Sequence, residues 1–354
     1  MLNIAHSRLL NQHIISPNLQ TPKAVVAHLG AVQAQDYPMA KWAVGLRLPS
    51  ANDALIENAL NKGEVVRTHV LRPTWHFVAA EDVRWLLKLT APHIHSAMNS
   101  YSKQMELDAA VFNKSNLIIE KTLTNNKHLT REELMIELGK AGINTQLNRA
   151  SHIMMNAELE GIVCNGIMRG KQHTYALMDE KVPKGLIFTR EEAIVELVKR
   201  YFNSHSPATL QDFQWWSGLP MGDVRKGIEA IKNDFISEKI NNQIYYFNSN
   251  NKTFETTESI HFLPAFDEFT VSYKDRIDSI EPHLKQIAMT SNGIFKPIIV
   301  VNGRVIGIWK RTIKKDKLMI EPQFFNNYTP LEKDIMLKEI KRFSDFNGLE
   351  IEFA

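Results

Sequence analysis

The stretch "LTREELMIELGKAG" (residues 129–142), followed by "TQLNRASHIMMNAELEG" (145–161), decides the fold of the middle of this chain. In the first stretch Thr130 and Glu133 have the spacing of a capping box, and Gly142 is a typical stop signal, so it predicts a helix. The second stretch has apolar residues at helical spacing and predicts another helix. The two stretches together indicate helix, turn, helix.

Two short β-rich runs follow this pair of helices. "IVCNGIM" (162–168) and "HTYALM" (173–178) are separated by "RGKQ", which predicts a hairpin. A further helix is predicted in front, near "KSNLIIEKTL" (114–123). The order of three helices and a hairpin is that of a winged helix-turn-helix.

The same order of elements returns after this unit. Thr189 and Glu192 have capping-box spacing, and Thr209 stands where it caps "LQDFQWWSG" (210–218). "MGDVRKGIEAIKNDF" then predicts the second helix of a turn, and "ISEKINNQIYYF" (236–247) predicts a hairpin with Asn241-Asn242 at its tip.

A copy with weaker signals precedes it at the N-terminus. "IAHSRLLNQH" (4–13) predicts a helix, Thr21-Pro22 starts a second, and Ser50 is expected to cap "ANDALIENAL" (51–60). "EVVRTHVLRPTWHFV" (64–78) predicts a longer hairpin, and a helix is expected from about residue 81 to residue 101.

The C-terminal part has a different texture. Asn302-Gly303 between two β-rich runs predicts a hairpin, and "KLMIEPQFF" adds a strand. Thr329-Pro330 is expected to start a closing helix that ends near Gly348. We therefore expect an α+β protein, mainly α with small β-hairpins, built of tandem winged helix-turn-helix domains and a C-terminal β-rich domain. The expected domains are residues 1–108, 109–184, 185–252 and 253–354.

Composition leaves few classes of protein open. With 44% hydrophobic and 23% charged residues the chain is an ordinary folded protein, and no apolar run is long enough to span a membrane. Cys164 is the only cysteine, which excludes an internal disulfide and a cysteine-based zinc site. The first residues lack the plan of a signal peptide. We therefore expect a cytoplasmic protein with no metal and no cofactor. A net charge of +3 and a pI near 8.7 permit a nucleic-acid partner without demanding one.

Basic residues on the predicted hairpins and helices are candidates for binding DNA, because Lys and Arg contact phosphates. Solvated loop charge is the alternative for each of them, and many winged helices serve as protein-docking modules instead. The helix at 145–161 has one arginine and two glutamates, which makes it a poor reader of the major groove. The candidates are Arg67, Arg72, His76, Arg149, Arg169 and Lys171.

Neighbouring residues on the first hairpin should point to opposite faces. We expect Trp75 in the core, which leaves His76 as a phosphate or lesion contact. Asp267 and Glu268 are expected to be structural and to bond Arg276 or backbone, because buried charges need partners. No converging set of carboxylates and histidines indicates a metal site.

Four segments together resemble the AlkZ-like bacterial DNA glycosylases, a winged-helix family that includes glycosylases acting on interstrand crosslinks. The resemblance covers essentially the whole chain. The segments are "LGAVQAQDYPMAKWAVGLRLP" (29–49), "LRPTWHFVAAEDVRWLL" (71–87), "LPAFDEFTVSYKDR" (263–276) and "GRVIGIWKR" (303–311).

The resemblance implies a monomer with tandem winged helices and a β-barrel-like C-terminal domain. It also implies base excision repair of double-stranded DNA, by removal of alkylated purines and unhooking of crosslinks. The family's catalytic Gln-x-Gln matches Gln33 and Gln35. Some relatives have Asp at the second position, so Gln35 points to the crosslink branch. The hairpin 65–78 would lie against the DNA at the lesion.

Amide chemistry agrees with this implication. Hydrolysis of an N-glycosidic bond passes through an oxocarbenium-like sugar. A glutamine is no strong base, but it accepts and donates hydrogen bonds and so can hold a water. A purine alkylated at N7 or N3 is cationic and leaves readily. Asp36 is the nearest carboxylate, either a base or a turn residue ahead of Tyr37-Pro38, and we favour the turn. The alternatives to a monofunctional glycosylase are a non-catalytic winged-helix transcriptional regulator and a protein-interaction scaffold.

Overall fold

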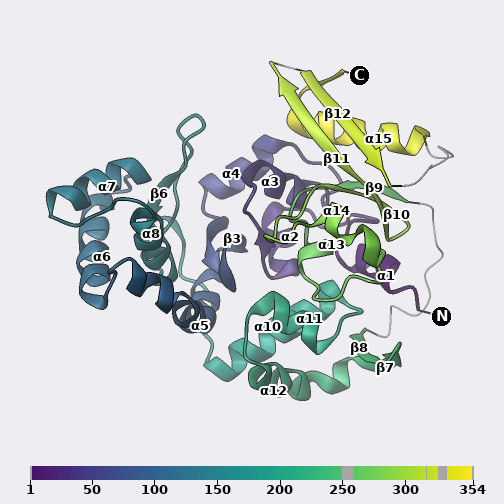
Figure 1. Ribbon diagram of the computed structural model, residues 1–354, viewed down its shortest axis with the longest axis horizontal. Helices are drawn as coiled ribbons and strands as arrows, with labels where there is room; N and C mark the ends of the chain where they lie inside the picture. Colours follow the sequence, from purple (N-terminus) through teal and green to yellow (C-terminus); the bar gives the residue numbers. More distant parts are fainter. Residues whose placement is uncertain (1, 249–258, 316, 326–332, 353–354) are drawn as a thin grey trace. The chain divides into compact units, whose positions relative to one another are not determined.

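The chain divides into two compact units, which are described separately (Figure 1). The computed structural model describes residues 2–248, 259–315, 317–325 and 333–352. Unit 1 comprises Met1–Glu57, Ile194–Trp216 and Pro220–Ala354, and unit 2 comprises Asn58–Ala193 and Ser217–Leu219. The fold class is α+β, as expected. The four-domain division stays a prediction.

Unit 2 contains the long helix α5, four shorter helices or helical turns and the hairpins between them. The hairpin predicted at residues 64–78 and the long helix predicted from about residue 81 to residue 101 are confirmed. The elements are β2 (Val65–Val70), β3 (Arg72–Ala79), α5 (Val83–Gln104), α6 (Ala109–Leu123), β4 (Leu129–Thr130), α7 (Arg131–Lys140), α8 (Arg149–Leu159), β5 (Val163–Asn165), β6 (Thr174–Leu177) and α9 (Met178–Lys181).

The segment from α6 to β6 has the element order that its sequence predicts. The side chain of Thr130 accepts from the Glu133 N–H at 3.2 Å and the Glu133 carboxylate accepts from the Thr130 N–H at 2.7 Å, which confirms the capping box. Strands β4, β6 and β5 form a three-stranded sheet in that order. Its core lies among α6, α7 and α8 and contains Ile119, Leu123, Leu134, Leu138, Ile153, Met154, Ala157 and Val163.

Unit 1 is assembled from the N-terminal, middle and C-terminal parts of the chain. Three of its helices, α4, α10 and α11, begin in one unit and end in the other. Its helices are α1 (Ile4–Asn11), α2 (Pro22–Leu29), α3 (Tyr37–Gly45), α4 (Asp53–Asn61), α10 (Arg190–His205), α11 (Leu210–Ser217), α12 (Met221–Ile231), α13 (Glu268–Val271), α14 (Lys285–Ala288) and α15 (Lys333–Asn347). Its strands are β1 (Val32–Gln33), β7 (Ile236–Ile240), β8 (Gln243–Phe247), β9 (Ile260–Leu263), β10 (Ile298–Val301), β11 (Arg304–Lys314), β12 (Lys317–Phe324) and β13 (Glu350–Glu352).

Two predicted hairpins of unit 1 are present with the expected turn residues. Asn241 and Asn242 connect β7 to β8 with φ of 48° and 66°, and Asn302 and Gly303 connect β10 to β11 with φ of 50° and 86°. Positive φ at both central positions matches the twist of the flanking strands. These signals are local, which is why the sequence alone locates the turns.

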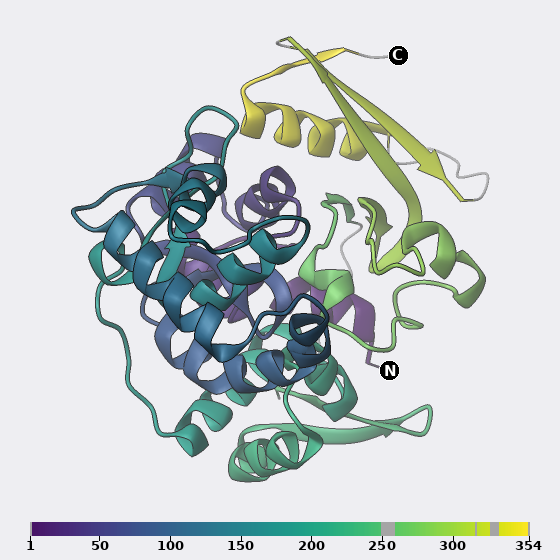
Figure 2. The ribbon, with the colours of Figure 1, turned by 60° about the vertical axis from the view of Figure 1, so that its left-hand side comes forward.

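The C-terminal part forms an open, half-barrel sheet and not a closed barrel. Its strand order is β13-β12-β11-β10-β9, and α15 lies beside it (Figure 2). The ring of Phe343 on α15 lies 5.2 Å from Trp309 of β11 and 5.2 Å from Trp42 of α3. Helix α15 therefore packs α3 and the sheet into one core.

Two predicted helix starts and one helix that the sequence did not predict remain to be compared. Helix α4 begins at Asp53, and Asn52 rather than Ser50 accepts from the N–H of Leu55 at 2.8 Å. Both residues are good cap formers, and the helix begins at the later one. The proposed start of α15 at Thr329-Pro330 lies outside the described residues. Helix α3 was not predicted, because its almost wholly buried sequence lacks the amphipathic period that reveals a helix.

Candidate active site and nucleic-acid interface

The Gln-x-Gln segment connects a two-residue strand to a buried helix. Gln33 is the second residue of β1 and is 7% exposed, whereas Gln35 lies in the following bend and is exposed. The carboxylate of Asp36 caps α3 by accepting from the Met39 N–H at 3.2 Å. The favoured turn role of Asp36 is thereby confirmed, and Pro38 occupies the first turn, where it is tolerated.

A carboxylate far along the chain holds the backbone of Gln33. The N–H of Gln33 donates to Glu268 Oε1 at 2.7 Å. The other oxygen, Oε2, accepts from Trp216 Nε1 at 3.1 Å and from the Ser272 hydroxyl. His205 Nε2 lies 3.8 Å from the same oxygen, and both side chains of that pair are fully buried.

Glu268 is ionised in this setting. Burial raises the pKa of its carboxyl, but the His205 ring 3.8 Å away and the hydrogen bonds from Ser272 and the Gln33 N–H outweigh burial and lower the pKa to about 2. Burial lowers the pKa of His205, and the neighbouring Glu268 carboxylate acts in the opposite direction. The carboxylate has three hydrogen-bond donors, the Gln33 N–H, Trp216 Nε1 and the Ser272 hydroxyl.

The preceding residue, Asp267, forms a buried ion pair and caps a helix. Arg47 donates to both of its carboxylate oxygens at 2.9 Å, and neither side chain is exposed. Asp267 also accepts from the Phe269 N–H at 2.9 Å and caps α13. The structural role expected for Asp267 is confirmed, and so is the backbone as a partner; its guanidinium partner is Arg47, and Arg276 donates to the carbonyls of Thr270 and Lys274.

Both carboxylates that the structure places beside the segment have partners. Asp36 caps a helix and lies 3.8 Å from Arg311 Nη2, and its side chain is 38% exposed. Glu268 is wholly buried and accepts from three donors.

The hairpin of β2 and β3 holds a stacked cation, Arg67, which is only 8% exposed. The guanidinium of Arg67 lies 4.4 Å from the Trp75 ring centroid, and the Arg67 N–H donates to Asn165 Oδ1 at 2.8 Å. The His69 ring lies 4.6 Å from Trp75, and His69 Nδ1 contacts the Glu158 carboxylate.

The expected orientation of Trp75 and His76 was wrong. Trp75 is half-buried, whereas His76 is 0% exposed and its Nδ1 lies 2.9 Å from the carbonyl of Thr74. The two neighbours do face opposite sides, but the core takes the imidazole and leaves the indole to stack on Arg67. His76 is therefore not proposed as a DNA contact. Arg72 is half-buried at the hairpin's turn.

The remaining basic candidates differ in how far they are already engaged. Arg149 donates from Nε to the Asn144 carbonyl at 2.7 Å and from Nη1 to the Met105 carbonyl, so it fastens the start of α8. Arg169 at the tip of the β5–β6 hairpin pairs with Glu133 and lowers the pKa of that carboxyl to about 2. Lys171 at the same tip is exposed.

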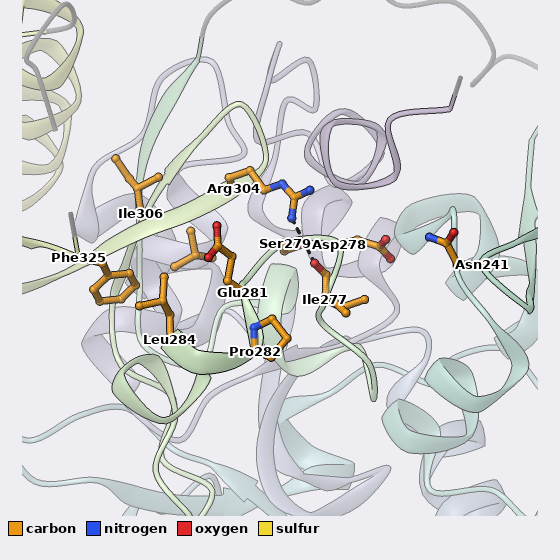
Figure 3. Close-up of a pocket in the computed structure, with 11 residues that line it drawn as sticks. Asn241, Ile277, Asp278, Ser279, Glu281, Pro282, Leu284, Arg304, Ile306 and Phe325 are labelled. Carbon is orange, nitrogen blue, oxygen red and sulfur yellow. Dashed lines mark hydrogen bonds between the residues drawn. The ribbon is translucent and has the colours of Figure 1, made fainter. Parts of the chain in front are cut away.

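Other features give no further candidate for the reaction. The described residues contain no cluster of three or more His, Cys, Asp or Glu side chains that could hold a metal. Within the same residues, no helix combines the length and apolarity needed to cross a membrane. A cavity of about 550 Å³ in unit 1 has Asp278, Glu281 and Arg304 on its wall (Figure 3), but neither Gln33 nor Gln35 lines it.

Comparisons with known proteins identify the family and a shared fold. The family model described as DNA glycosylase AlkZ-like matches residues 26–346. The interstrand DNA cross-link repair glycosylase of Streptomyces sahachiroi is 21% identical over 339 residues, which cover 88% of this chain and 88% of that protein. The solved structure of Streptomyces sahachiroi DNA glycosylase AlkZ has a TM-score of 0.82 at 20% identity and covers 99% of this chain and 98% of that chain.

These findings define an enzyme of the DNA glycosylase class. Because the family model matches most of its length, the chain belongs to the AlkZ-like DNA glycosylase family. Membership favours the enzyme over the non-catalytic regulator. The likeness to the solved structure shows that the fold is shared.

Sequence reasoning did not find the link between Gln33 and Glu268. The two residues are separated by 235 positions, and no local pattern joins them. The only signal was that both belong to segments that carry the family resemblance.

Proposed function

We propose that this enzyme is a monofunctional glycosylase that hydrolyses the N-glycosidic bond of cationic N-alkylated purines in double-stranded DNA. Gln33 and Gln35 hold the attacking water and stabilise the developing sugar cation. The observation that supports this most is the amide pair on a segment whose neighbouring carboxylates are both engaged. Since we assign neither carboxylate as a base, the leaving group must bring its own activation.

The energetics of such a site are those of positioning. Holding a nucleophile in line with the reacting carbon can supply roughly 7–11 kcal/mol of a barrier. A neutral purine needs an acid to protonate the leaving base, whereas a purine with an alkyl group at N7 or N3 is already charged. We therefore propose activity on cationic adducts and none on uracil or unmodified purines.

The surrounding architecture is proposed to bind the duplex. The helix–helix–helix–hairpin segments act as winged helices, and the exposed cations Arg169 and Lys171 contact phosphates at a hairpin tip. The half-buried Arg72 and Trp75 present the β2–β3 hairpin to DNA, and Arg67, which is 8% exposed, stacks on Trp75. Crosslink repair, the activity named for the relative from Streptomyces sahachiroi, is proposed here as a second use of the same site. We propose that the enzyme acts as a monomer in the cytoplasm.

The test is single-turnover base release from duplex DNA with one N7-methylguanine. Wild type should release the base, and Gln33→Ala and Gln35→Ala should lose release while they still bind DNA. Gln20→Ala is the matched control, because Gln20 is an exposed glutamine of the same unit. Excision of an unmodified purine by wild type would refute the requirement for a cationic leaving group.

A further inference from the structure

We propose that Glu268 is a positioning residue that holds the Gln-x-Gln segment in its working geometry through the backbone of Gln33. The inference rests on the proposed function, since it assigns to Glu268 a role through Gln33 and Gln35. Glu268 is 0% exposed, so we expect it to act through the groups that it binds.

The first step of the argument is the bond itself. The N–H of Gln33 donates to Glu268 Oε1 at 2.7 Å within the interior of unit 1. Hydrogen bonds to an ionised acceptor are roughly twice as strong as neutral ones. Fixing this N–H fixes the backbone direction at Gln33, and with it the bond from which the amide side chain starts.

The second step is that Glu268 is itself held from the opposite side. Its Oε2 accepts from Trp216 Nε1 at 3.1 Å and from the Ser272 hydroxyl. The Trp216 ring in turn packs against Gly30, where φ is +81° and an added Cβ would lie 3.2 Å from the ring. The same tryptophan therefore contacts the chain just before β1 and the carboxylate that holds β1.

The third step is that the three donors around Glu268 need an ionised carboxylate. A neutral acid would place an O–H donor where the carboxylate offers lone pairs to three donors. The ionised form is the one that satisfies Gln33, Trp216 and Ser272 together.

The consequence is a rate effect that a general loss of stability does not produce. Release by this enzyme depends on positioning, and a displacement of about 1 Å can cost roughly 100-fold in rate. Glu268→Gln keeps the shape but removes one acceptor and the charge. We expect about 10–100-fold slower base release at saturating enzyme, with DNA affinity unchanged.

The experiment compares Glu268→Gln with Asp212→Asn below both melting temperatures. Asp212 is 1% exposed, accepts backbone N–H groups of Thr209, Lys274 and Asp275 and lies 3.8 Å from Arg8 Nη2, so its variant is an isosteric change of a buried carboxylate that does not bond Gln33 in the structure. The readouts are single-turnover release from N7-methylguanine DNA and hydrogen exchange of the Gln33 amide. Glu268→Gln should slow release and speed exchange, and Asp212→Asn should do neither.

Each other outcome is informative. If Glu268→Gln releases the base at the wild-type rate, or if both variants lose release equally, the positioning role is overturned. Base release by the wild-type enzyme upholds the proposed function in both cases. No release by wild type would overturn the proposed function, and unchanged Gln33 exchange in Glu268→Gln would then overturn the anchoring as well. If Glu268→Gln does not fold, Ser272→Ala removes one donor to Oε2 and should give the same two changes to a smaller extent.

Discussion

Replacing Asp267 by asparagine should destabilise unit 1 strongly, because it leaves a buried guanidinium without its counter-charge. Arg47 Nη1 and Nη2 each donate to one oxygen of Asp267 at 2.9 Å. Its other N–H groups donate to the Gln12 carbonyl at 3.0 Å, to Gln12 Oε1 at 3.0 Å and to the Ala43 carbonyl at 2.7 Å. Every donor of the guanidinium is thus satisfied, and the side chain is 0% exposed.

The magnitude follows from that burial. Removing one partner of a buried ion pair costs about 3–5 kcal/mol. Asparagine keeps one oxygen for Arg47, so we expect the lower end, about 3 kcal/mol. Because the whole stability of a protein is about 5–15 kcal/mol, this is a large fraction of it. At roughly 2–4 °C per kcal/mol for a unit of this size, the melting temperature should fall by about 6–12 °C.

The assay is urea unfolding followed by tryptophan fluorescence. Asp345→Asn is the control, because the Asp345–Lys341 pair on α15 is 62% and 68% exposed and such pairs contribute little. In the double variant Arg47→Met with Asp267→Asn the charge leaves together with its partner. Its cost should be smaller than the sum of the two single variants. A shift in Asp267→Asn no larger than that of Asp345→Asn would refute the reasoning.

Three further outcomes follow from single groups. Burial lowers the pKa of His28 from 6.5 to about 4, so the unfolded chain binds a proton that the folded chain does not. The free energy of unfolding should therefore fall by at most about 3 kcal/mol as the pH drops from 6.5 to about 4, and His28 should have no such effect above pH 6.5. Urea titrations should show a shallower dependence of stability on pH for His28→Gln, and equal slopes would contradict this. Burial raises the pKa of the Cys164 thiol to about 12, so the native chain should resist a maleimide that labels the unfolded chain, and rapid native labelling would disprove the burial. Glu133→Gln should free Arg169 while keeping the bond to the Thr130 N–H, and so tighten DNA binding at low salt; unchanged affinity would remove Arg169 from the interface.

Local chemistry explains why much of the fold could be predicted from the sequence. The capping box of Thr130 and Glu133 and the turn at Asn302 depend on residues at most three positions apart. Such local signals do not depend on how the rest of the chain folds. Where several cap formers stood close together, as at Ser50 and Asn52, the type of element was predicted but its first residue was not.

Burial explains most of what could not be predicted. Helix α3 is apolar on nearly every side, so it has no period that separates a helix from a buried loop. The orientation of Trp75 and His76 was wrong because an alternation rule gives two faces without saying which one is core. Here the larger ring is stacked under Arg67 at 4.4 Å, a contact that no strand pattern encodes.

The candidate site combines one predictable part with one that only the fold supplies. Gln33 and Gln35 are conspicuous in the sequence because two amides flank an alanine in an apolar stretch. The difference in their burial is seen only in the structure. Gln33 is 7% exposed and fixed through its backbone, whereas Gln35 lies in an exposed bend. A water between them would meet one amide placed by the interior and one reachable from solvent. The proposed mechanism depends on positioning and needs the first amide to be rigid, which is why we propose that a carboxylate 235 residues away affects the rate.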